Sequence, residues 1–458
     1  MVSTRGPVWP HLFPPTDPVA ALQVFLSDEE IETICHQLGH MWRDRSLPPG
    51  VTARSLVYRS LHPDRSIAAT VADLAAARAV PAAEGTVPDD APSASAWCQA
   101  RDRLPLDLWP RLHRRSVERL RHLAGAAHVV FGRPLYIFDG STVSMPDTDD
   151  LVAAFGYART NHGLSRFPVA RFAVLLLAGV EAACAWRLDP YRTSEDAQLH
   201  HLWDALPEGS ICLFDKYLSS FYNLAKLHNR GIDVLTRLHQ HRRPDRLIPA
   251  GRRLGKDQWL VRLDLDPQRR RRYDDPSLPA YLTVRLIRVT FRHGGKRHKA
   301  WLVTTLLDPK RYPRAALVHL YRRRWGIETR FDTLKTTLAL NVLRSKTALG
   351  VAHEVAATVL AHNLVWTLIH QAARQTDTPA DRISFAGAVK TARAFSTALR
   401  HAEPDRRPLL YAQMLRQIAR RRNPYRPGRS EPRLIKRDPV RYNYLRIPRD
   451  QARRKCLS

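Results

Sequence analysis

The sequence lacks any cysteine pattern that would build a disulfide or metal framework. Its five cysteines are scattered over 458 residues, and no two of them stand in a Cys-x-x-Cys arrangement. The segment HEVAATVLAH at 353–362 brings His and Glu together but lacks the His-Glu-x-x-His spacing of a zinc helix. These absences exclude a disulfide-stapled secreted domain and argue against a zinc site. We expect reduced thiols in a reducing compartment.

Long hydrophobic runs are also missing. The longest clean apolar run, FAVLLLAGV at 172–180, is about half the length that spans a bilayer. Residues 1–15, MVSTRGPVWPHLFPP, contain no apolar signal core. The sequence therefore predicts a soluble, cytoplasmic protein without a membrane partner.

Lysine and acidic residues are scarce relative to arginine. The chain has 11 lysines and 62 arginines against 43 acidic residues, which gives a formal net charge of +30. A positive field of this size indicates nucleic acid as the partner, with an anionic membrane surface as the alternative. Arginine makes bidentate contacts to phosphate, which fits nucleic acid. A GC-rich genome would also favour arginine over lysine, but it would not raise the net charge.

The N-terminal region, residues 1–130, is predicted to be helical and to bind DNA. Helical patterns cover 26–42, where Ser27 is a candidate N-cap, and the basic stretch 107–124. Between them, residues 79–97 are rich in Ala, Pro and Ser and indicate a flexible connection.

The rest of the chain has an α/β pattern with an interruption. Residues 131–240 alternate β-prone runs with helical ones: strands are predicted over 134–145, 167–180, 182–192, 210–218 and 232–239, and helices over 194–206 and 219–231. Residues 241–308 alternate apolar and basic residues with period two, which predicts a β-rich insertion with one basic face. Helical periodicity then returns within 309–400, over 313–340 and 352–375.

The C-terminal region, residues 401–458, is basic. Its stretch 416–455 is rich in proline and poor in core residues, so we expect an extended arm that lies along an acidic partner.

Two aspartates share an environment in which catalytic carboxylates are often held. Asp139 follows the apolar run YIF, and Asp215 follows CLF. Neighbouring strands bring their ends close together, and two such carboxylates with a third acid would supply the hard oxygen ligands that Mg²⁺ prefers. The alternative is that each Asp merely starts a turn, which is common where Gly follows, as Gly140 does here.

The third acid is found in the stretch YRRRWGIETRFDTLK, residues 321–335. At about 100° per residue, a helix would align Tyr321, Arg324, Glu328 and Lys335 on one stripe roughly 60° wide. An adjacent stripe is apolar and would face the core; it contains Leu320, Ile327, Phe331, Leu334 and Leu338. A solvent-exposed helix would instead distribute its charged residues over its whole outer face, and the other charged residues of this stretch are distributed in that way.

The spacing Tyr-x2-Arg-x3-Glu-x6-Lys resembles the Y-R-E-K signature of the bacterial DDE transposases of the insertion-sequence-four family. Other segments resemble that family in the same order: FDGSTVSMPDT around Asp139, PYRTSE at 190–195, FDKYLSSFYNLAKLHNRGIDVLTRLHQ from Asp215, and NPYRPGRSEPRLIKRDP near the C-terminus. The resemblance covers roughly residues 20 to 440. Lys216 departs from the family, which often has Arg or another residue there.

The resemblance implies a ribonuclease-H-like catalytic core, with residues 131–240 and 309–400 as its two parts and the β-rich insertion between them. It implies that Asp139, Asp215 and Glu328 bind two divalent ions, Mg²⁺ or Mn²⁺, for in-line displacement at phosphorus. It also implies that Tyr321, Arg324 and Lys335 contact DNA phosphates, and that Trp301 stacks on a flipped base. Trp301 could equally fill the core of the insertion, and Trp259 is a rival for the stacking role.

The function expected from the resemblance is DNA transposition. Such an enzyme binds double-stranded DNA at the terminal inverted repeats of its insertion sequence, cuts it, and joins it to target DNA. The resemblance also implies a homodimer on two paired ends, in a bacterial cytoplasm and at the nucleoid. Two alternatives remain: a ribonuclease-H-like nuclease that cleaves without strand transfer, and a DNA-binding protein that has lost catalysis.

Overall fold

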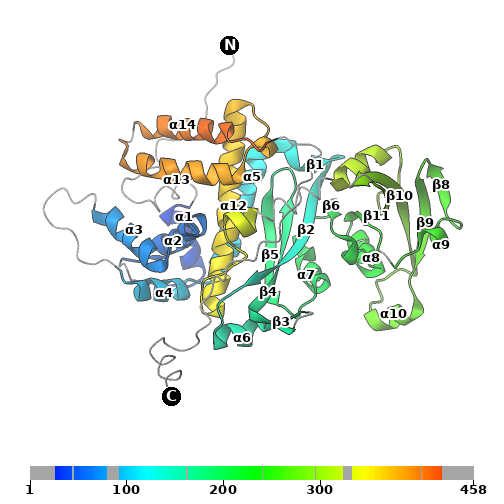
Figure 1. The fold of residues 1–458 in the computed structure, drawn as a ribbon, viewed down its shortest axis with the longest axis horizontal. Coiled ribbons are helices and arrows are strands. Elements are labelled where there is room, and N and C mark those ends of the chain that lie inside the picture. The colour runs from blue at the N-terminus through cyan, green and yellow to red at the C-terminus, as the bar shows by residue number, and fades with distance from the viewer. Residues whose placement is uncertain are drawn as a thin grey trace, which may run out of the picture. The chain divides into compact units, whose positions relative to one another are not determined.

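The computed structural model describes residues 26–43, 46–79, 92–160, 163–239, 241–293, 296–322, 333–403 and 405–424. The chain forms two compact units, and each is assembled from separate stretches of sequence. The first, here called the helical unit, takes residues 1–123, 143–169 and 333–458. The second, here called the sheet unit, takes residues 124–142 and 170–332. The colours of Figure 1 follow these stretches along the chain.

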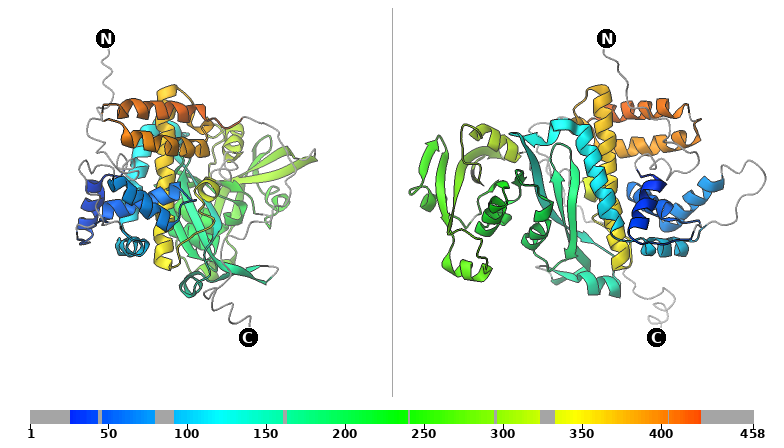
Figure 2. Two further views of the ribbon diagram at one scale, coloured as in Figure 1. Left: turned by 60° about the vertical axis from the view of Figure 1, so that its left-hand side comes forward. Right: turned by 180° about the vertical axis from the view of Figure 1, so that it is seen from behind.

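The helical unit is built around one long helix. Its helices are α1 (Asp28–Gln37), α2 (Pro49–Leu61), α3 (Ile67–Ala79), α4 (Ala94–Arg103), α5 (Leu108–Ala124), α6 (Asp149–Phe155), α12 (Ala348–Thr376), α13 (Phe385–His401) and α14 (Arg407–Arg420). The 29-residue α12 packs against α2, α13 and α14, as the views of Figure 2 show. By length and composition α12 could cross a membrane, but 83% of its most apolar stretch is buried within the structure.

Local signals explain the first helices of this unit. The side chain of Ser27 caps α1 by accepting from the Glu30 backbone N–H at 3.1 Å, as predicted. The helix ends at Gln37, five residues before the predicted end, because Gly39 takes a positive φ of 70°. The flexible connection predicted over 79–97 ends before residue 97. The helix α4 already begins at Ala94, where Ser93 caps it, and Trp97 is fully buried. Residues 80–91 of this connection lie outside the described ranges.

A mixed sheet forms the sheet unit. Its strands are β1 (Val129–Val130), β2 (Arg133–Ser144), β4 (Gly163–Leu177), β5 (Ala182–Pro190), β6 (Ile211–Leu213), β7 (Asp233–Arg237), β8 (Arg252–Gly255), β9 (Gln258–Asp264), β10 (Tyr281–His293) and β11 (Lys296–Thr304). Their order is β5-β4-β2-β6-β7-β11-β10-β9-β8, with β1 paired to β2. The first part of β4 belongs to the helical unit, where it pairs with β3 (Tyr157–Thr160). The predicted α/β class is confirmed.

Two pairs of strands in this sheet are parallel: β2 with β6, and β6 with β7. Helices occupy the connections between them, as a parallel pair requires. These helices are α7 (Glu195–Leu202) and α8 (Phe221–Asn229); α9 (Pro244–Leu247), α10 (Pro267–Tyr273) and a helix over 314–322 follow. Short 3₁₀ segments cover Gly125–His128, Trp203–Ala205, Lys216–Leu218 and Ala380–Arg382. All three residues of β6 are buried, and so are the three central residues of β7.

The strands predicted over 241–308 extend this same sheet. β11 pairs antiparallel with β7, in the register Leu302 to Arg237 and Thr304 to Leu235. β10, β9 and β8 follow as an antiparallel meander. The predicted basic face is interrupted at Arg285, which is fully buried and donates to the Tyr312 carbonyl at 2.8 Å.

The helix predicted over 313–340 is observed in two described pieces. One covers residues 314–322, and the other is a π-helical turn, Thr333–Thr337. The turn ends there, and Ala339 has a positive φ of 56°, so the predicted end at residue 340 is wrong. Leu320, Leu334 and Leu338 are buried, as the apolar stripe predicts. Residues 323–332, which include Arg324 and Glu328, lie outside the described ranges.

The predicted arm at 416–455 is wrong at its start, because α14 continues to Arg420. Residues 425–458, which hold most of that arm, are outside the described ranges.

Candidate active site

Three neighbouring parallel strands carry charged residues at one level. The last parallel pairs are Ile137 with Leu213, between β2 and β6, and Leu213 with Leu235, between β6 and β7. Two residues beyond each of these positions stand Asp139, Asp215 and Arg237. Because adjacent strands lie about 4.8 Å apart, three charged side chains are gathered at this edge of the parallel ladder.

The two aspartates are held in different ways. Asp139 lies inside β2, whose range Arg133–Ser144 agrees with the strand predicted over 134–145, so it stands within a strand and not at a strand end. Its Oδ1 accepts from the Gly140 backbone N–H at 3.0 Å. Asp215 does follow its strand and caps the 3₁₀ turn Lys216–Leu218, with Oδ1 accepting from the Lys216 N–H at 2.6 Å.

Arg237 is the cation of this group. Its Nη2 lies 3.5 Å from Oδ1 of Asp215, and both side chains are about 30% exposed, at 30% and 29%. Solvent therefore reaches the pair, and Oδ2 of Asp215 has no partner in the described part of the chain. Sequence reasoning missed Arg237, although it ends the apolar strand DVLTR just as Asp215 follows CLF.

A partly buried ion pair fixes the strands at their opposite end. Arg133 of β2 donates to the carboxylate of Asp233 on β7 and to the Ser210 carbonyl at 3.0 Å. Thr305 also donates to Asp233. Burial alone would raise the pKa of Asp233, but hydrogen bonds from His228, Thr305 and Arg133 outweigh it and lower that pKa to about 2. β2 and β7, which flank β6, are thus tied together below the charged group.

The carboxylate oxygens at this edge of the sheet are suitable ligands for a divalent cation. Asp139 and Asp215 supply carboxylate oxygens, the hard ligands that Mg²⁺ and Mn²⁺ prefer. Within the described ranges, no group of three or more His, Cys, Asp or Glu side chains is placed to hold a metal ion. Glu328, the predicted third ligand, is outside those ranges.

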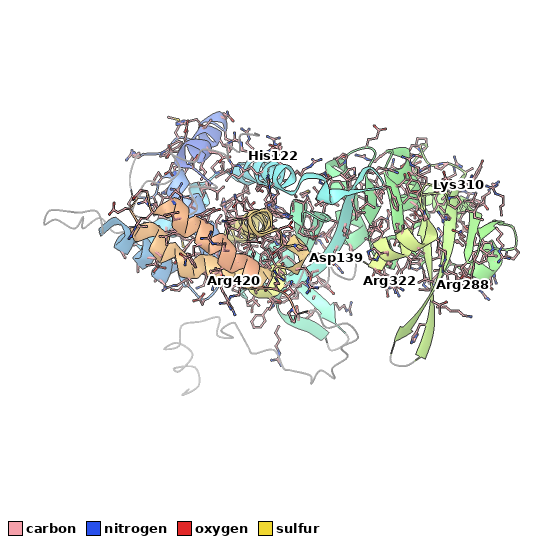
Figure 3. All side chains as sticks on the ribbon, turned by 90° about the horizontal axis from the view of Figure 1, so that it is seen from above. His122, Asp139, Arg288, Lys310, Arg322 and Arg420 are labelled. Carbon is pink, nitrogen blue, oxygen red and sulfur yellow. The ribbon has the colours of Figure 1, made fainter. Side chains whose placement is uncertain are left out.

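Tyr321 and Arg237 line the same small cavity. The cavity has a volume of about 40 Å³ and is lined by Arg237, Val289, Ala300, Leu302, Val318, Tyr321 and Arg322. The Tyr321 side chain is only 7% exposed, whereas Arg322 is exposed. Figure 3 labels Asp139 and Arg322 within the sheet unit. Lys335, on the π-helical turn, belongs to the helical unit and is half-buried.

Trp301 and its rival Trp259 contact one another. Their ring centroids are 5.6 Å apart, and their planes are inclined at 49°. The Arg288 guanidinium lies 5.8 Å from the Trp259 ring, and Arg288 pairs with Trp301 in the β10–β11 register. Arg288 also donates to Asp257, and this hydrogen bond lowers the pKa of that carboxyl. Both tryptophans are half-buried, so the stacking and core interpretations of Trp301 both stay open.

Comparison with known proteins identifies the family to which the chain belongs. The profile of the family described as "Transposase DDE domain" matches residues 131–364, which is more than half of the chain and includes both aspartates. The chain belongs to the DDE transposase family. It is therefore a DNA transposase, and its family uses divalent metal ions.

Two relatives agree with this assignment. The transposase is 28% identical over 365 residues to "Transposase InsG for insertion sequence element IS4" of Escherichia coli (strain K12), covering 78% of this chain and 79% of the relative. It is 32% identical over 101 residues to "Putative transposase InsZ" of the same organism, covering 22% and 34%. The resemblance to the insertion-sequence-four family is thereby confirmed.

Proposed function

We propose that this transposase binds the terminal inverted repeats of its own insertion sequence, cuts the DNA there, and joins the cut ends to a target. The observation that carries the proposal is the side-by-side placement of Asp139 and Asp215 at the level where the parallel ladder ends. The positive charge of the chain supports DNA as the partner.

The catalytic core in this proposal is ribonuclease-H-like. The strand order β5-β4-β2-β6-β7, with β2, β6 and β7 parallel, supports this, and the core takes residues 131–240 and 309–400. Residues 241–308 form the β-strand insertion between its two parts. The helical region 1–130 and the basic region 401–458 are proposed to bind DNA outside the core.

The residues proposed to hold metal are Asp139, Asp215 and Glu328, with two Mg²⁺ or Mn²⁺ ions. When bound, the ions lower the pKa of the attacking water or 3′-hydroxyl and stabilise the leaving oxygen. The part of this chain is to hold its carboxylates in place, since the 2.6 Å bond from the Lys216 N–H orients Asp215. Arg237 balances the charge of Asp215 before metal and DNA enter.

Other residues are proposed to hold the DNA. Tyr321, Arg324 and Lys335 grip backbone phosphates near the scissile bond, and Trp301 stacks on an unpaired base. Two transposon ends are proposed to be paired by a homodimer. The reaction is placed at the nucleoid of a bacterial cytoplasm, without a membrane.

The test is cleavage of the element's own ends by the full chain with Mg²⁺, followed on a denaturing gel. We expect Glu328→Ala and Asp139→Asn to abolish nicking, with a loss of at least ~10³-fold, because charge stabilisation at the reacting phosphate is lost. Binding of the end, measured by gel shift, should change little.

Asp264→Asn is the matched control, since that carboxylate is 65% exposed on β9 and should leave nicking intact. If Glu328→Ala still cuts, the assignment of the third ligand is wrong. Cut products that are never joined to target DNA would favour a nuclease without strand transfer.

A further inference from the structure

A tyrosine ring is exposed to solvent two residues beyond Asp215. Tyr217 is 59% exposed, whereas the next residue, Leu218, is only 2% exposed. Both belong to the 3₁₀ turn Lys216–Leu218 that follows β6. A single exposed aromatic residue is common on protein surfaces and by itself indicates no function. Tyr217 differs in its position, because Asp215 is one of the two carboxylates gathered where the parallel ladder ends.

Hydrogen bonds hold the backbone of this turn in place. Oδ1 of Asp215 accepts from the Lys216 N–H at 2.6 Å, and the Asp215 carbonyl accepts from the Leu218 N–H at 3.1 Å. At the other end of the turn, the side chain of Asn223 donates to the Leu218 carbonyl at 2.9 Å, and Asn223 is fully buried in α8. The residue that carries the exposed ring is therefore tied to the same carboxylate that is proposed to hold metal.

Cationic and aromatic side chains surround the ring. Nζ of Lys216 lies 4.7 Å from the ring centroid of Tyr217, which is a cation–π contact. The His239 ring lies 6.1 Å from that of Tyr217 at an angle of 74°, and the His241 ring lies 4.9 Å from that of His239. Arg237 completes the group through its contact with the Asp215 carboxylate. An exposed aromatic ring beside cations is the combination on which proteins stack the bases of single-stranded nucleic acid.

This ring is separate from Trp301. Leu302 of β11 pairs with Arg237 of β7, and paired residues of antiparallel strands point to the same face of a sheet. Successive side chains of a strand alternate between the faces, so Trp301 points to the face opposite Arg237. A base held against Trp301 would lie away from the face on which Arg237 meets Asp215, and Tyr217 offers a second ring beside that carboxylate.

We propose that Tyr217 stacks on an unpaired base of the DNA strand that is cut, at the first or second nucleotide from the scissile phosphate. The proposal rests on the proposed function, because the metal-binding role of Asp215 is what places the scissile phosphate nearby. Cα atoms two residues apart are separated by at most about 7 Å, and stacked nucleotides rise about 3.4 Å each, so these bases are within reach. Every base has an aromatic face, and no preference for one base is expected.

Photocross-linking tests the contact between base and ring directly. The full chain is bound to the end of its element, in which 5-iododeoxyuridine replaces one nucleotide at a time on both sides of the cut. We expect a cross-link to Tyr217, located by mass spectrometry, from a position next to the cut and none from a position one helical turn away. Absence of a cross-link to Tyr217 from every position beside the cut would overturn the proposal.

Two variants distinguish stacking from a structural role of the side chain. Tyr217→Leu keeps an apolar side chain but loses the ring, so the kcat/KM of nicking should fall about tenfold or more. Tyr217→Phe keeps the ring and should cut and cross-link as the unaltered chain does. A loss in Tyr217→Phe as large as in Tyr217→Leu would assign the effect to the hydroxyl group and contradict stacking.

Tyr281→Leu is the matched control. Tyr281 is 48% exposed, and the Arg262 guanidinium lies 4.0 Å from its ring, so its surroundings resemble those of Tyr217. It stands on β10, however, which β7 and β11 separate from β6. Tyr281→Leu should nick at full rate, and the midpoint of urea unfolding should be unchanged in both leucine variants. Equal nicking by Tyr217→Leu and Tyr281→Leu would contradict the proposal.

Failure of the proposed function gives a different result from failure of this inference. A chain that cross-links through Tyr217 beside the expected cut but never cuts the end contradicts the proposed function and leaves the stacking contact supported. A chain that cuts the end with no cross-link to Tyr217, and equally well as Tyr217→Leu, supports the function and removes the stacking contact.

Discussion

The ion pair between Arg133 and Asp233 supports the site without taking part in it. It joins the first residue of β2 to the first residue of β7, and the side chains are only 15% and 19% exposed. Asp139 and Arg237 lie farther along these same strands. A substitution at Asp233 should therefore lower the stability of the fold. It should affect the positions of Asp139 and Arg237 only indirectly, through the strands that carry them.

The stabilising effect of Asp233 should depend on pH. Its pKa of about 2 is below the ordinary 3.8, so its contribution is complete above pH 3.8 and is lost as the pH falls through 2. Asp233→Asn should lower the free energy of unfolding by about 2 kcal/mol at pH 7, and by progressively less as the pH falls below about 4. Urea unfolding from pH 7 to pH 2 measures the difference. If the loss of unfolding free energy in Asp233→Asn grew as the pH fell, the lowered pKa of Asp233 would be contradicted.

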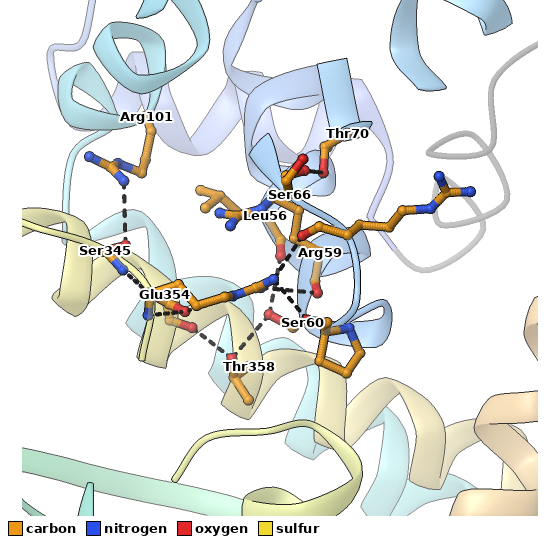
Figure 4. Close-up of polar contacts among 12 residues, drawn as sticks. Leu56, Arg59, Ser60, Ser66, Thr70, Arg101, Ser345, Glu354 and Thr358 are labelled. Carbon is orange, nitrogen blue, oxygen red and sulfur yellow. Dashed lines mark hydrogen bonds and ion pairs between the residues drawn. The ribbon is translucent and has the colours of Figure 1, made fainter. Parts of the chain in front are cut away.

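At the scale of elements, α12 binds α2 and α4 through a buried polar cluster (Figure 4). Glu354 of α12 accepts from the backbone N–H groups of Arg344 and Ser345, at 3.0 and 2.8 Å. Arg59 of α2 and Arg101 of α4 approach the ring of Trp97, at 5.1 and 5.9 Å. Burial, and then the neighbouring Arg344, lower the pKa of Arg59 to about 10. Glu354 thus offsets a surplus of buried positive charge.

Removing this carboxylate should unfold the helical unit more easily. Glu354→Ala leaves two backbone donors and the arginines without their anion, so we expect a loss of about 3 kcal/mol in unfolding free energy. Glu354→Gln keeps one acceptor oxygen and should lose about half as much. The measurement is urea unfolding followed by circular dichroism, with exposed Glu403→Ala as the control. A loss in Glu354→Ala no larger than that of the control would refute the role given to the cluster.

Elements were predictable where one physical signal dominates. Asp139 and Asp215 could be paired in advance because each follows an apolar β-prone run, and parallel neighbours align such positions. Arg237 stands at the equivalent position of β7, but an arginine at the end of a β-prone run does not indicate a metal ligand, so its sequence context did not predict a place in the site. The π-helical turn at Thr333–Thr337 could not be foreseen, since an apolar stripe does not distinguish an α-helix from a wider turn. The close approach of Glu195 to Gly140 could not be predicted either, because it brings together two residues that no local sequence pattern connects.

At the scale of the whole molecule, charge should dominate DNA affinity. With a formal net charge of +30, the transposase should release many counterions when it binds. We expect its affinity for a duplex of random sequence to fall about 10³-fold or more between 50 and 200 mM salt. Fluorescence anisotropy measures this, and an unchanged urea midpoint over the same salt range shows that folding is not the cause. Salt-independent affinity would rule out a phosphate-dominated interface.

The discontinuous make-up of the helical unit has a consequence for protein synthesis. Ser60 of α2 and Thr358 of α12 lie 3.0 Å apart, Oγ to Oγ1, although 298 residues separate them in the chain. Ribosomes add about 5–20 residues per second, so α2 waits roughly 15–60 s for its partner helix to emerge. The sheet unit ends at residue 332 and is complete before α12 is translated. The strands that carry Asp139 and Asp215 can therefore assemble first, and the N-terminal helices, although made earliest, are among the last parts of the nascent chain to be secured.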